Sequence, residues 1–376
     1  PTQSGKKSKV NYAARDARSS PRIKRNRRRK SFRRKILTFR ASSNICIIMT
    51  ISEENSKAVN VLKYILAILV VFIHIPAETR NDPVYNGFVA NITRTAVPFF
   101  FAISGFFAAN KQYGTLLKSR FFSLVATMVI WDIVCFALIF PLTCQKPELS
   151  KTAFYIRWIL GFSTTPTDMP LWYLRNLFVM VAISPVISLL AVRFRNALKC
   201  LILLGIPAFV FADTAAMTLH VSPCYYNMAV QSAVFFSAGM YAALNEVRIE
   251  TEGKFLRAAT ACFCITCAGY FLAENETIKS AFSQTSALLF AVPAFRLAKS
   301  IGRKMPAGRA KYLAKLSLFI FVSHYIFACA YSKWIEPHCA GFEGSAVSVA
   351  YIACVVALLS YAYGFIPDKC KRILRI

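Results

Sequence analysis

The sequence is poor in acidic residues and in histidine: its 376 residues include 17 Asp and Glu against 46 Lys and Arg, and four His. It has no Walker-type glycine loop, no serine nucleophile elbow and no Ser-His-Asp pattern, which argues against a covalent intermediate on serine. No internal repeat is recognisable. We expect no removable signal peptide, because the first apolar run ends at IHIPAETR and not at a small-residue cleavage site.

Apolar residues dominate what is present. Hydrophobic residues make up 56% of the chain, the mean hydropathy is +0.46, and there are 32 Phe. The apolar residues fall in runs of about 14–22, long enough for helices that cross a hydrocarbon layer of ~30 Å. The sequence therefore predicts an all-α membrane protein with about ten transmembrane helices, over residues 57–76, 92–109, 121–142, 171–192, 198–213, 228–244, 256–273, 281–297, 313–331 and 346–367.

The net charge of +29 is unevenly distributed along the chain. Residues 1–40 hold 16 Lys and Arg against the single acid Asp16, so we expect a disordered basic extension over residues 1–48 and an integral membrane domain over 49–376. Such a block can attract anionic partners, but a solvated tail has the same composition, and we expect no nucleic-acid partner. Loops expected on the cytoplasmic side carry 20 basic residues and outer loops carry 7, which predicts cytoplasmic N- and C-termini.

Twelve cysteines do not indicate a disulfide scaffold, because most of them lie within apolar runs where small side chains suit helix packing. Cys262, Cys264 and Cys267 are closely spaced, but a helix would splay them around its circumference and no fourth ligand is nearby. We therefore expect no metal site. One disulfide is left open among three cysteines of the expected outer loops, Cys144, Cys224 and Cys339.

His74 lies near the end of the first apolar stretch, and Lys63 lies eleven residues before it. A helix turns by 100° per residue, so eleven residues return to within about 20° of the same face, ~16 Å further along. Ionisable groups in an apolar span usually face the protein interior, because leaving them unpaired in hydrocarbon costs several kcal/mol. The pair indicates a candidate reaction site, although a packed interfacial histidine and a snorkelling lysine would give the same pattern.

Four segments carry a family resemblance: KYILAILVVFIH, RTAVPFFFAISGF, LWYLRNLF and LAKLSLFIFVSHY. They resemble the membrane acyltransferase 3 family, the integral membrane O-acyltransferases of surface glycans, over roughly residues 57–367. In that family the first helix carries a basic residue, ten intervening positions and a histidine, which fall on Lys63 and His74. The basic residue is arginine in many members, so Lys63 is a weaker match. The resemblance implies a ten-helix enzyme that moves an acyl group from acyl-CoA to a hydroxyl.

Acyl transfer from a thioester to a hydroxyl needs a base that removes the hydroxyl proton during attack, and imidazole suits this near neutral pH. We therefore predict His74 as the general base and Lys63 as a group that seats the acyl-CoA donor. Arg94, at the outer entrance of the second span, is the second candidate catalytic residue, because its guanidinium can polarise the carbonyl or position the acceptor. The alternative for Arg94 is a boundary arginine at the lipid headgroups.

Three further residues are predicted to bind the donor: Ser104, beside Gly105 in the second span, and Lys118 and Arg120 at the inner start of the third. Small residues let helices approach closely or a ligand arm pass between them, and basic side chains suit the phosphates of acyl-CoA. Plain helix packing explains Ser104 equally well, and the positive-inside rule explains Lys118 and Arg120 without a ligand.

Trp172, Arg175 and His324 are candidate cavity-lining residues. Trp172 fits an interfacial aromatic, and Arg175 fits a buried arginine held by an acidic partner such as Asp132. His324 is the second intramembrane histidine, and the resemblance suggests a recurring histidine at this position. For His324, a structural hydrogen bond is the alternative to a place in the cavity.

The sequence thus predicts a multi-pass O-acyltransferase of the cell inner membrane. Its co-substrate is acyl-CoA, most often acetyl-CoA, and we expect no tightly bound cofactor. The acceptor is a hydroxyl of a cell-surface glycan or glycolipid, and the lipid bilayer is the surrounding partner. The rival hypothesis is a secondary transporter or polysaccharide exporter without covalent chemistry, although such proteins commonly show repeated halves. The identity of the acceptor and the oligomeric state are left open.

Overall fold

The computed structural model describes residues 52–75, 82–109, 122–143, 171–193, 196–212, 215, 223–245, 253–338 and 341–374. Within these ranges every regular element is a helix, as the all-α prediction requires. The predicted extension over residues 1–48 lies outside the described residues. The predicted donor-binding residues Lys118 and Arg120 lie outside them as well.

Each of the ten predicted segments overlaps a helix in the described part of the chain, with ends that differ by up to seven residues. These helices are α2 (Glu53–His74), α4 (Ala96–Ala109), α6 (Phe122–Thr143), α8 (Trp172–Arg193), α9 (Ala197–Val210), α11 (Pro223–Leu244), α12 (Gly253–Leu272), α13 (Glu276–Lys304), α14 (Ala307–Trp334) and α15 (Gly341–Phe365). Four short elements accompany them: α3 (Pro83–Asn91), the 3-10 helices η2 (Thr93–Thr95) and η5 (Glu336–His338), and α16 (Asp368–Ile373).

Six stretches of the described residues are long and apolar enough to cross a membrane: Glu53–His74, Pro83–Ala109, Trp172–Ala191, Gly253–Leu272, Ala307–His338 and Ser345–Phe365. Shorter apolar stretches lie in α6, α9 and α11. Helix α13 falls in neither group, because polar and basic residues interrupt its apolar character. The protein therefore has the composition of a multi-pass membrane protein, while ten crossings and cytoplasmic termini stay predictions.

The second predicted span differs from the structure in its shape. We expected one helix over residues 92–109, but the apolar stretch begins at Pro83 and is divided by η2 into α3 and α4. Asp82 begins α3, where its Oδ1 accepts hydrogen bonds from the backbone N–H groups of Val84 at 2.9 Å and Tyr85 at 3.2 Å. Pro98 lies in the first turn of α4, where a missing N–H costs little. The turn between the two helices carries Arg94.

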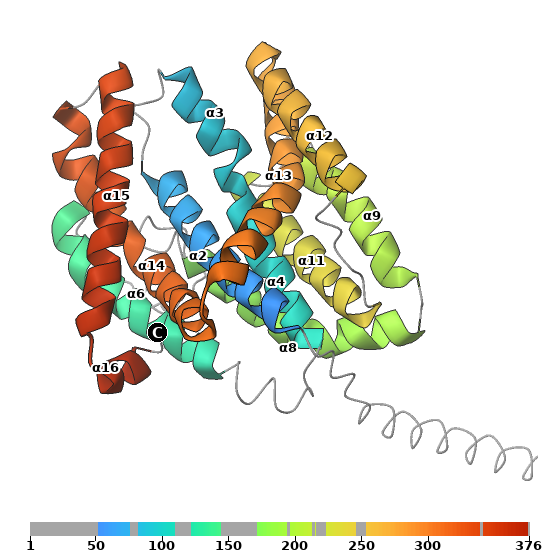
Figure 1. Cartoon of the computed structure of the whole chain (residues 1–376), viewed down its shortest axis with the longest axis horizontal. Coiled ribbons are helices and arrows are strands. Elements are labelled where there is room, and N and C mark those ends of the chain that lie inside the picture. Colours follow the sequence, from blue (N-terminus) through green and yellow to red (C-terminus); the bar gives the residue numbers. More distant parts are fainter. Residues whose placement is uncertain are drawn as a thin grey trace, which may run out of the picture. The chain divides into compact units, whose positions relative to one another are not determined.

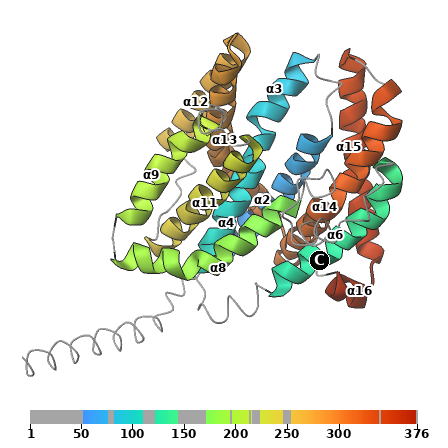
Figure 2. The same ribbon diagram turned by 180° about the vertical axis from the view of Figure 1, so that it is seen from behind.

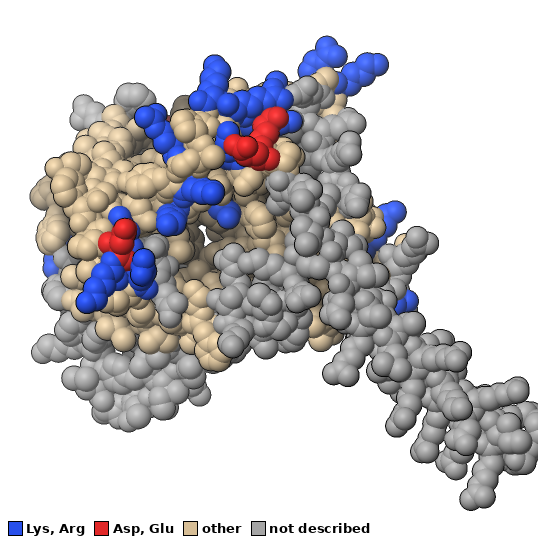
Figure 3. Space-filling view, turned by 60° about the horizontal axis from the view of Figure 1, so that its bottom comes forward, with Lys and Arg blue, Asp and Glu red and all other residues tan. Residues whose placement is uncertain are grey.

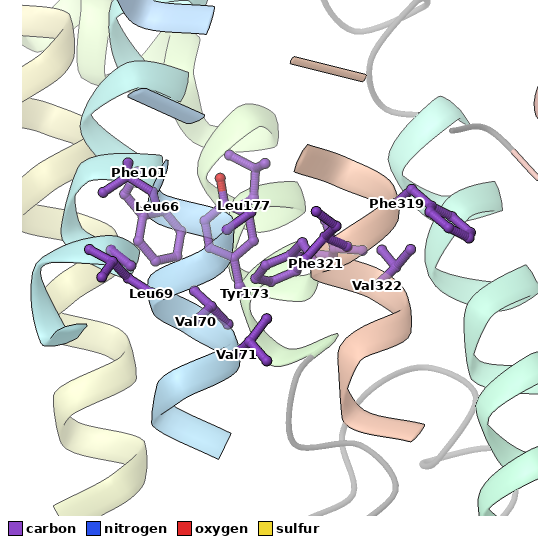
Figure 4. Packing of buried hydrophobic residues seen from close by; sticks show 14 of the residues in the cluster. Leu66, Leu69, Val70, Val71, Phe101, Tyr173, Leu177, Phe319, Phe321 and Val322 are labelled. Carbon is purple, nitrogen blue, oxygen red and sulfur yellow. The ribbon is translucent and has the colours of Figure 1, made fainter. Parts of the chain in front are cut away.

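Helix α2 lies inside the helical bundle, packed against α14, α13 and α4 (Figures 1 and 2). Helices α9 and α12 lie at one edge of the bundle, and α6 and α15 lie at the other. Figure 4 shows the buried cluster around α2, whose labelled members are Leu66, Leu69, Val70, Val71, Phe101, Tyr173, Leu177, Phe319, Phe321 and Val322. Because lipid is as apolar as these side chains, close packing rather than exclusion of water holds such helices together.

Helices α4 and α11 approach each other closely at two glycines. A Cβ added at Gly105 would lie 2.8 Å from the backbone carbonyl carbon of Phe236 and nearer still to its oxygen. A Cβ at Gly239 would meet the carbonyl group of Ala102 in the same way. These glycines therefore let the two backbones touch, which supports the packing alternative for the Ser104–Gly105 pair.

We expect Gly105→Ala to destabilise the protein, because the new methyl group meets backbone that cannot rotate away. Overpacking of this kind costs about 1–3 kcal/mol. The matched control is Gly364→Ala in α15, where an added Cβ meets nothing within 4 Å among the described residues. Thermal unfolding of the purified protein in detergent checks this prediction. Equal melting temperatures for the two variants would contradict the close approach.

Candidate active site

The C-terminal end of α2 places His74. Ser52 begins this helix, accepting a hydrogen bond from the backbone N–H of Asn55 at 3.3 Å, and Glu53 and Glu54 lie in its first turn. Acidic residues in the first turn of a helix interact favourably with the helix dipole. His74 is the last helical residue of α2.

A cavity of about 270 Å³ opens beside His74. Apart from aliphatic side chains, the cavity is lined by basic, aromatic and carboxamide groups. These are His74 and Arg94; Trp172, Tyr173 and Phe321; and Gln231 and Gln284. They come from α2, η2, α8, α11, α13 and α14. With Val97 of α4, which also lines it, the cavity is assembled by seven elements from different parts of the sequence, and it contains no acidic side chain among its described lining residues.

Two histidines from different helices lie next to each other at this site. The ring centroids of His74 and His324 are 5.1 Å apart, and that of Tyr325 is 5.7 Å from His74. Nδ1 of His324 lies 2.7 Å from the carbonyl oxygen of Phe321. A carbonyl oxygen can only accept, so Nδ1 carries the proton and Nε2 keeps its lone pair. That Nε2 atom is buried and has no hydrogen-bond partner among the described residues.

Arg94 reaches the cavity from η2, and its side chain is exposed. Three buried hydrogen bonds join the region around η2 to α13: from Ser283 Oγ to the carbonyl oxygen of Ala90 at 2.8 Å, from Ser286 Oγ to Oδ1 of Asn91 at 2.6 Å, and from Thr95 Oγ1 to the carbonyl oxygen of Ala287 at 2.9 Å. Buried polar groups that are fully bonded give a region a defined geometry. The turn that carries Arg94 is therefore fixed to the wall of the cavity.

Trp172 and Tyr173 form the α8 side of the cavity. The Tyr173 ring lies 4.7 Å from the Phe101 ring, and its hydroxyl group is 3.2 Å from that of Ser104. Ser104 thus contacts the cavity wall through Tyr173 and is not itself a lining residue. Arg175, also in α8, is half-buried and is not among the lining residues either.

Lys63 lies at some distance from the cavity, on the same helix as His74. Its Nζ is 5.1 Å from the centre of the Phe107 ring, near the end of α4. Leu66 and Ala67 of α2 are fully buried between Lys63 and His74. The described residues therefore bring His74, Arg94 and Trp172 to one cavity, with His324 beside them, and leave Lys63 outside it.

The start of α2 opens onto a strongly basic face. Glu54 accepts a hydrogen bond from Arg303 Nε at 2.5 Å and lies 3.7 Å from Lys299 Nζ, which joins α2 to the end of α13. Figure 3 shows Lys and Arg side chains gathered around a hollow on this face. Exposed Lys and Arg residues at the end of α13, at the start of α14 and in α16 include Arg303, Lys304, Arg309, Lys311, Lys315, Lys369 and Arg372. A face of this charge attracts anions such as phosphates.

Gln231 and Gln284 are lining residues that the sequence alone did not indicate. A carboxamide inside an apolar helix is costly unless it is bonded or faces a cavity, and this was the available signal. Among the described residues, no three of His, Cys, Asp and Glu come together in a way that could hold a metal ion. Cys262 and Cys264 are exposed on α12.

Comparison with known proteins agrees with the family that the motifs indicated. A model of the acyltransferase domain matches residues 56–364. The chain is also similar to the succinoglycan biosynthesis protein ExoH of Rhizobium meliloti (strain 1021), with 24% identity over 236 residues that cover 55% of this chain and 59% of that protein. The chain thus spans about three fifths of the length of this curated relative. No solved structure matches it. With the domain match extending over most of its helices, the chain belongs to the acyltransferase 3 family.

Proposed function

We propose that this protein is a membrane O-acyltransferase that moves an acyl group, most often acetyl, from cytoplasmic acyl-CoA to a hydroxyl of a cell-surface polysaccharide or glycolipid. Its membership of the acyltransferase 3 family and its similarity to a succinoglycan biosynthesis protein support this proposal. We place it in the cytoplasmic membrane with both termini on the cytoplasmic side, in keeping with the basic loops.

One observation carries the proposal: His74 and Arg94 line the same cavity although they come from different elements. A base and a cation beside one cavity are two groups that transfer from a thioester can use. A purely structural histidine or a headgroup arginine has no reason to face such a space. The cavity of about 270 Å³ is slightly smaller than the ~300 Å³ at which pockets for drug-sized ligands begin, so it can hold part of a substrate and not a whole acyl-CoA molecule.

In the proposed reaction, a nitrogen of His74 takes the proton of the acceptor hydroxyl while the hydroxyl oxygen attacks the carbonyl carbon of the thioester. Arg94 donates a hydrogen bond to the carbonyl oxygen, where negative charge develops. The carbon–sulfur bond then breaks, the thiolate of CoA takes the proton from the imidazolium, and the ester is released. His324 lies against His74 and holds its own ring by the bond to Phe321, which fits a role in orienting His74.

The donor would enter from the basic face, since acyl-CoA carries several phosphates and that face is cationic. Lys63 lies between this face and the cavity and would contact the donor on its way. Leu66 and Ala67, which lie between Lys63 and His74 on α2, are fully buried in the packed bundle. The thioester arm must therefore pass beside α2 or displace these side chains to reach His74.

Labelled acetyl-CoA offered to the purified protein tests the proposal. The acceptor is the surface polysaccharide of a strain that lacks the gene, treated with mild alkali to remove its esters. We expect label on the polysaccharide and release of free CoA in equal amounts. Flux of a substrate across proteoliposomes without any CoA release would favour the transporter or exporter instead.

We expect Lys63→Ala to raise the KM for acetyl-CoA by about tenfold or more, because a hydrogen bond from a cation to a charged group contributes ~1.5–3 kcal/mol. The KM for the polysaccharide should stay unchanged. Lys279→Ala is the matched control: Lys279 lies at the start of α13, where it bonds Glu276 at 2.8 Å. A Lys63→Ala enzyme with an unaltered KM for acetyl-CoA would contradict the donor role.

A further inference from the structure

Gln284 is a polar residue of the cavity whose burial is not explained by a hydrogen bond within the described part of the protein. It is 2% exposed, and its Oε1 atom is buried without a hydrogen-bond partner among the described residues. It faces the cavity that His74 and Arg94 also line. A buried carbonyl oxygen without a hydrogen-bond donor costs free energy. A bound ligand that donates a hydrogen bond to Oε1 of Gln284 would remove this cost.

The polar neighbours of Gln284 on α13 have structural partners. Ser283 and Ser286 bond to α3, and the hydroxyl of Thr285 donates to the carbonyl oxygen of Ala281 in its own helix at 2.8 Å. The bonds of Ser283 and Ser286 to α3 fix the position of the helix on both sides of Gln284. The backbone at Gln284 is therefore held in place by its neighbours. Its carboxamide lines the cavity and makes none of these hydrogen bonds.

The other lining groups define the chemistry that would fit beside it. Gln231 of α11 offers a second carboxamide, and Trp172 offers an aromatic surface. Carboxamides bind hydroxyl groups as donors and acceptors, and an aromatic ring packs against an apolar face. A sugar ring has both features, with hydroxyl groups around its edge and C–H groups on its faces. The volume of about 270 Å³ suits one ring rather than several.

We propose that this cavity is the subsite for the single sugar ring that receives the acyl group, and that Gln284 selects it by accepting a hydrogen bond from a hydroxyl next to the one that reacts. The inference rests on the proposed function, because it takes His74 to be the base for the reacting hydroxyl. Gln284 is then a specificity-determining residue of the acceptor side, with Gln231 and Trp172 as its neighbours.

The pantetheine arm of acyl-CoA is the competing occupant, since its amide N–H groups could also reach Oε1 of Gln284. The two occupants are distinguished by which substrate depends on the carboxamide. An acceptor subsite makes polysaccharide binding depend on Gln284 in the absence of acyl-CoA. A pantetheine subsite makes the KM for acyl-CoA depend on it instead.

The test compares Gln284→Met, which keeps the length of the side chain but removes the carboxamide, with Gln284→Asn, which keeps the carboxamide but shortens its reach. Thr285→Val is the matched control, because it removes a hydroxyl of the same helix turn that does not line the cavity. The probe is a set of ester-free oligosaccharides released from the surface polysaccharide of the deletion strain. Calorimetry on the full-length protein in nanodiscs measures their binding, and CoA release measures transfer.

We expect Gln284→Met to weaken oligosaccharide binding by about fivefold or more, with the KM for acetyl-CoA changed less than twofold. Gln284→Asn should fall between the wild type and Gln284→Met, and it carries the test if the methionine variant does not fold. Unchanged oligosaccharide binding in both variants would overturn the subsite, and so would a raised KM for acetyl-CoA alone. A third outcome is that the Gln284 variants bind the oligosaccharides more weakly than the wild type, while the wild type itself releases no CoA. That result would support the subsite and reject the proposed function.

Discussion

Replacing His74 with glutamine is expected to lower the rate of acyl transfer by about 10²–10⁴, the usual contribution of a positioned general base. Glutamine fills a similar volume but cannot take a proton at neutral pH. The cavity should therefore keep its shape, and the KM for acetyl-CoA should change little. CoA release by the purified variant, together with mass spectra of the surface polysaccharide from cells that carry it, measures the effect.

The matched control for this substitution is His338→Gln. His338 is an exposed histidine of η5 and is not among the residues that line the cavity. We expect it to leave transfer and folding unchanged. Full acylation by the His74→Gln protein would remove the base from the mechanism, whereas a loss in both variants would indicate a general effect of the substitution.

Arg94→Gln is expected to reduce kcat by about 10²–10³, which is the cost of removing one donor to a developing oxyanion. The effect on kcat should exceed the effect on either KM, because the charge on the carbonyl oxygen appears only in the transition state. Arg94→Lys should recover part of the rate, since it keeps the charge and loses the planar fork of donors. Steady-state kinetics with each substrate varied in turn measure these effects.

Lys333→Gln removes a cation from the exposed C-terminal end of α14 without altering a lining residue of the cavity, and we expect it to have little effect. This control separates the loss of a specific donor from the loss of positive charge at the membrane boundary. An Arg94→Gln variant that binds lipid poorly but transfers acyl groups at the normal rate would assign Arg94 to the headgroups instead.

Most of the long helices were predictable from the sequence because they are apolar runs bounded by charged or turn-forming residues. The break at η2 was not, since the residues from Ile92 to Thr95 include neither glycine nor proline to mark a change of helical conformation there. Helix α13 was predicted as a span, yet its composition is too polar for a span judged by hydropathy alone. The tertiary structure explains Ser283 and Ser286 of this helix, because both donate hydrogen bonds to oxygen atoms of α3.

The candidate site was predictable only in part, for a similar reason. His74 and Arg94 could be singled out because ionisable groups near apolar spans are rare and costly. The stripe of Lys63 and His74 follows from helical periodicity, but periodicity does not reveal that packed leucine and alanine side chains separate the two. Gln231 and Gln284 escaped notice because a neutral carboxamide in a helix can face a neighbour, lipid or a cavity, and the sequence does not say which.

By itself, the sequence determined the helical class, the approximate bounds of the helices and the family, because these depend on local composition and on motifs that are continuous in the chain. Only the tertiary structure decided which side chains share a cavity. His74 and His324 are 250 positions apart, and their rings meet because α2 packs against α14. Such a contact depends on how helix surfaces interlock, which is a property of pairs of helices and not of either sequence segment alone.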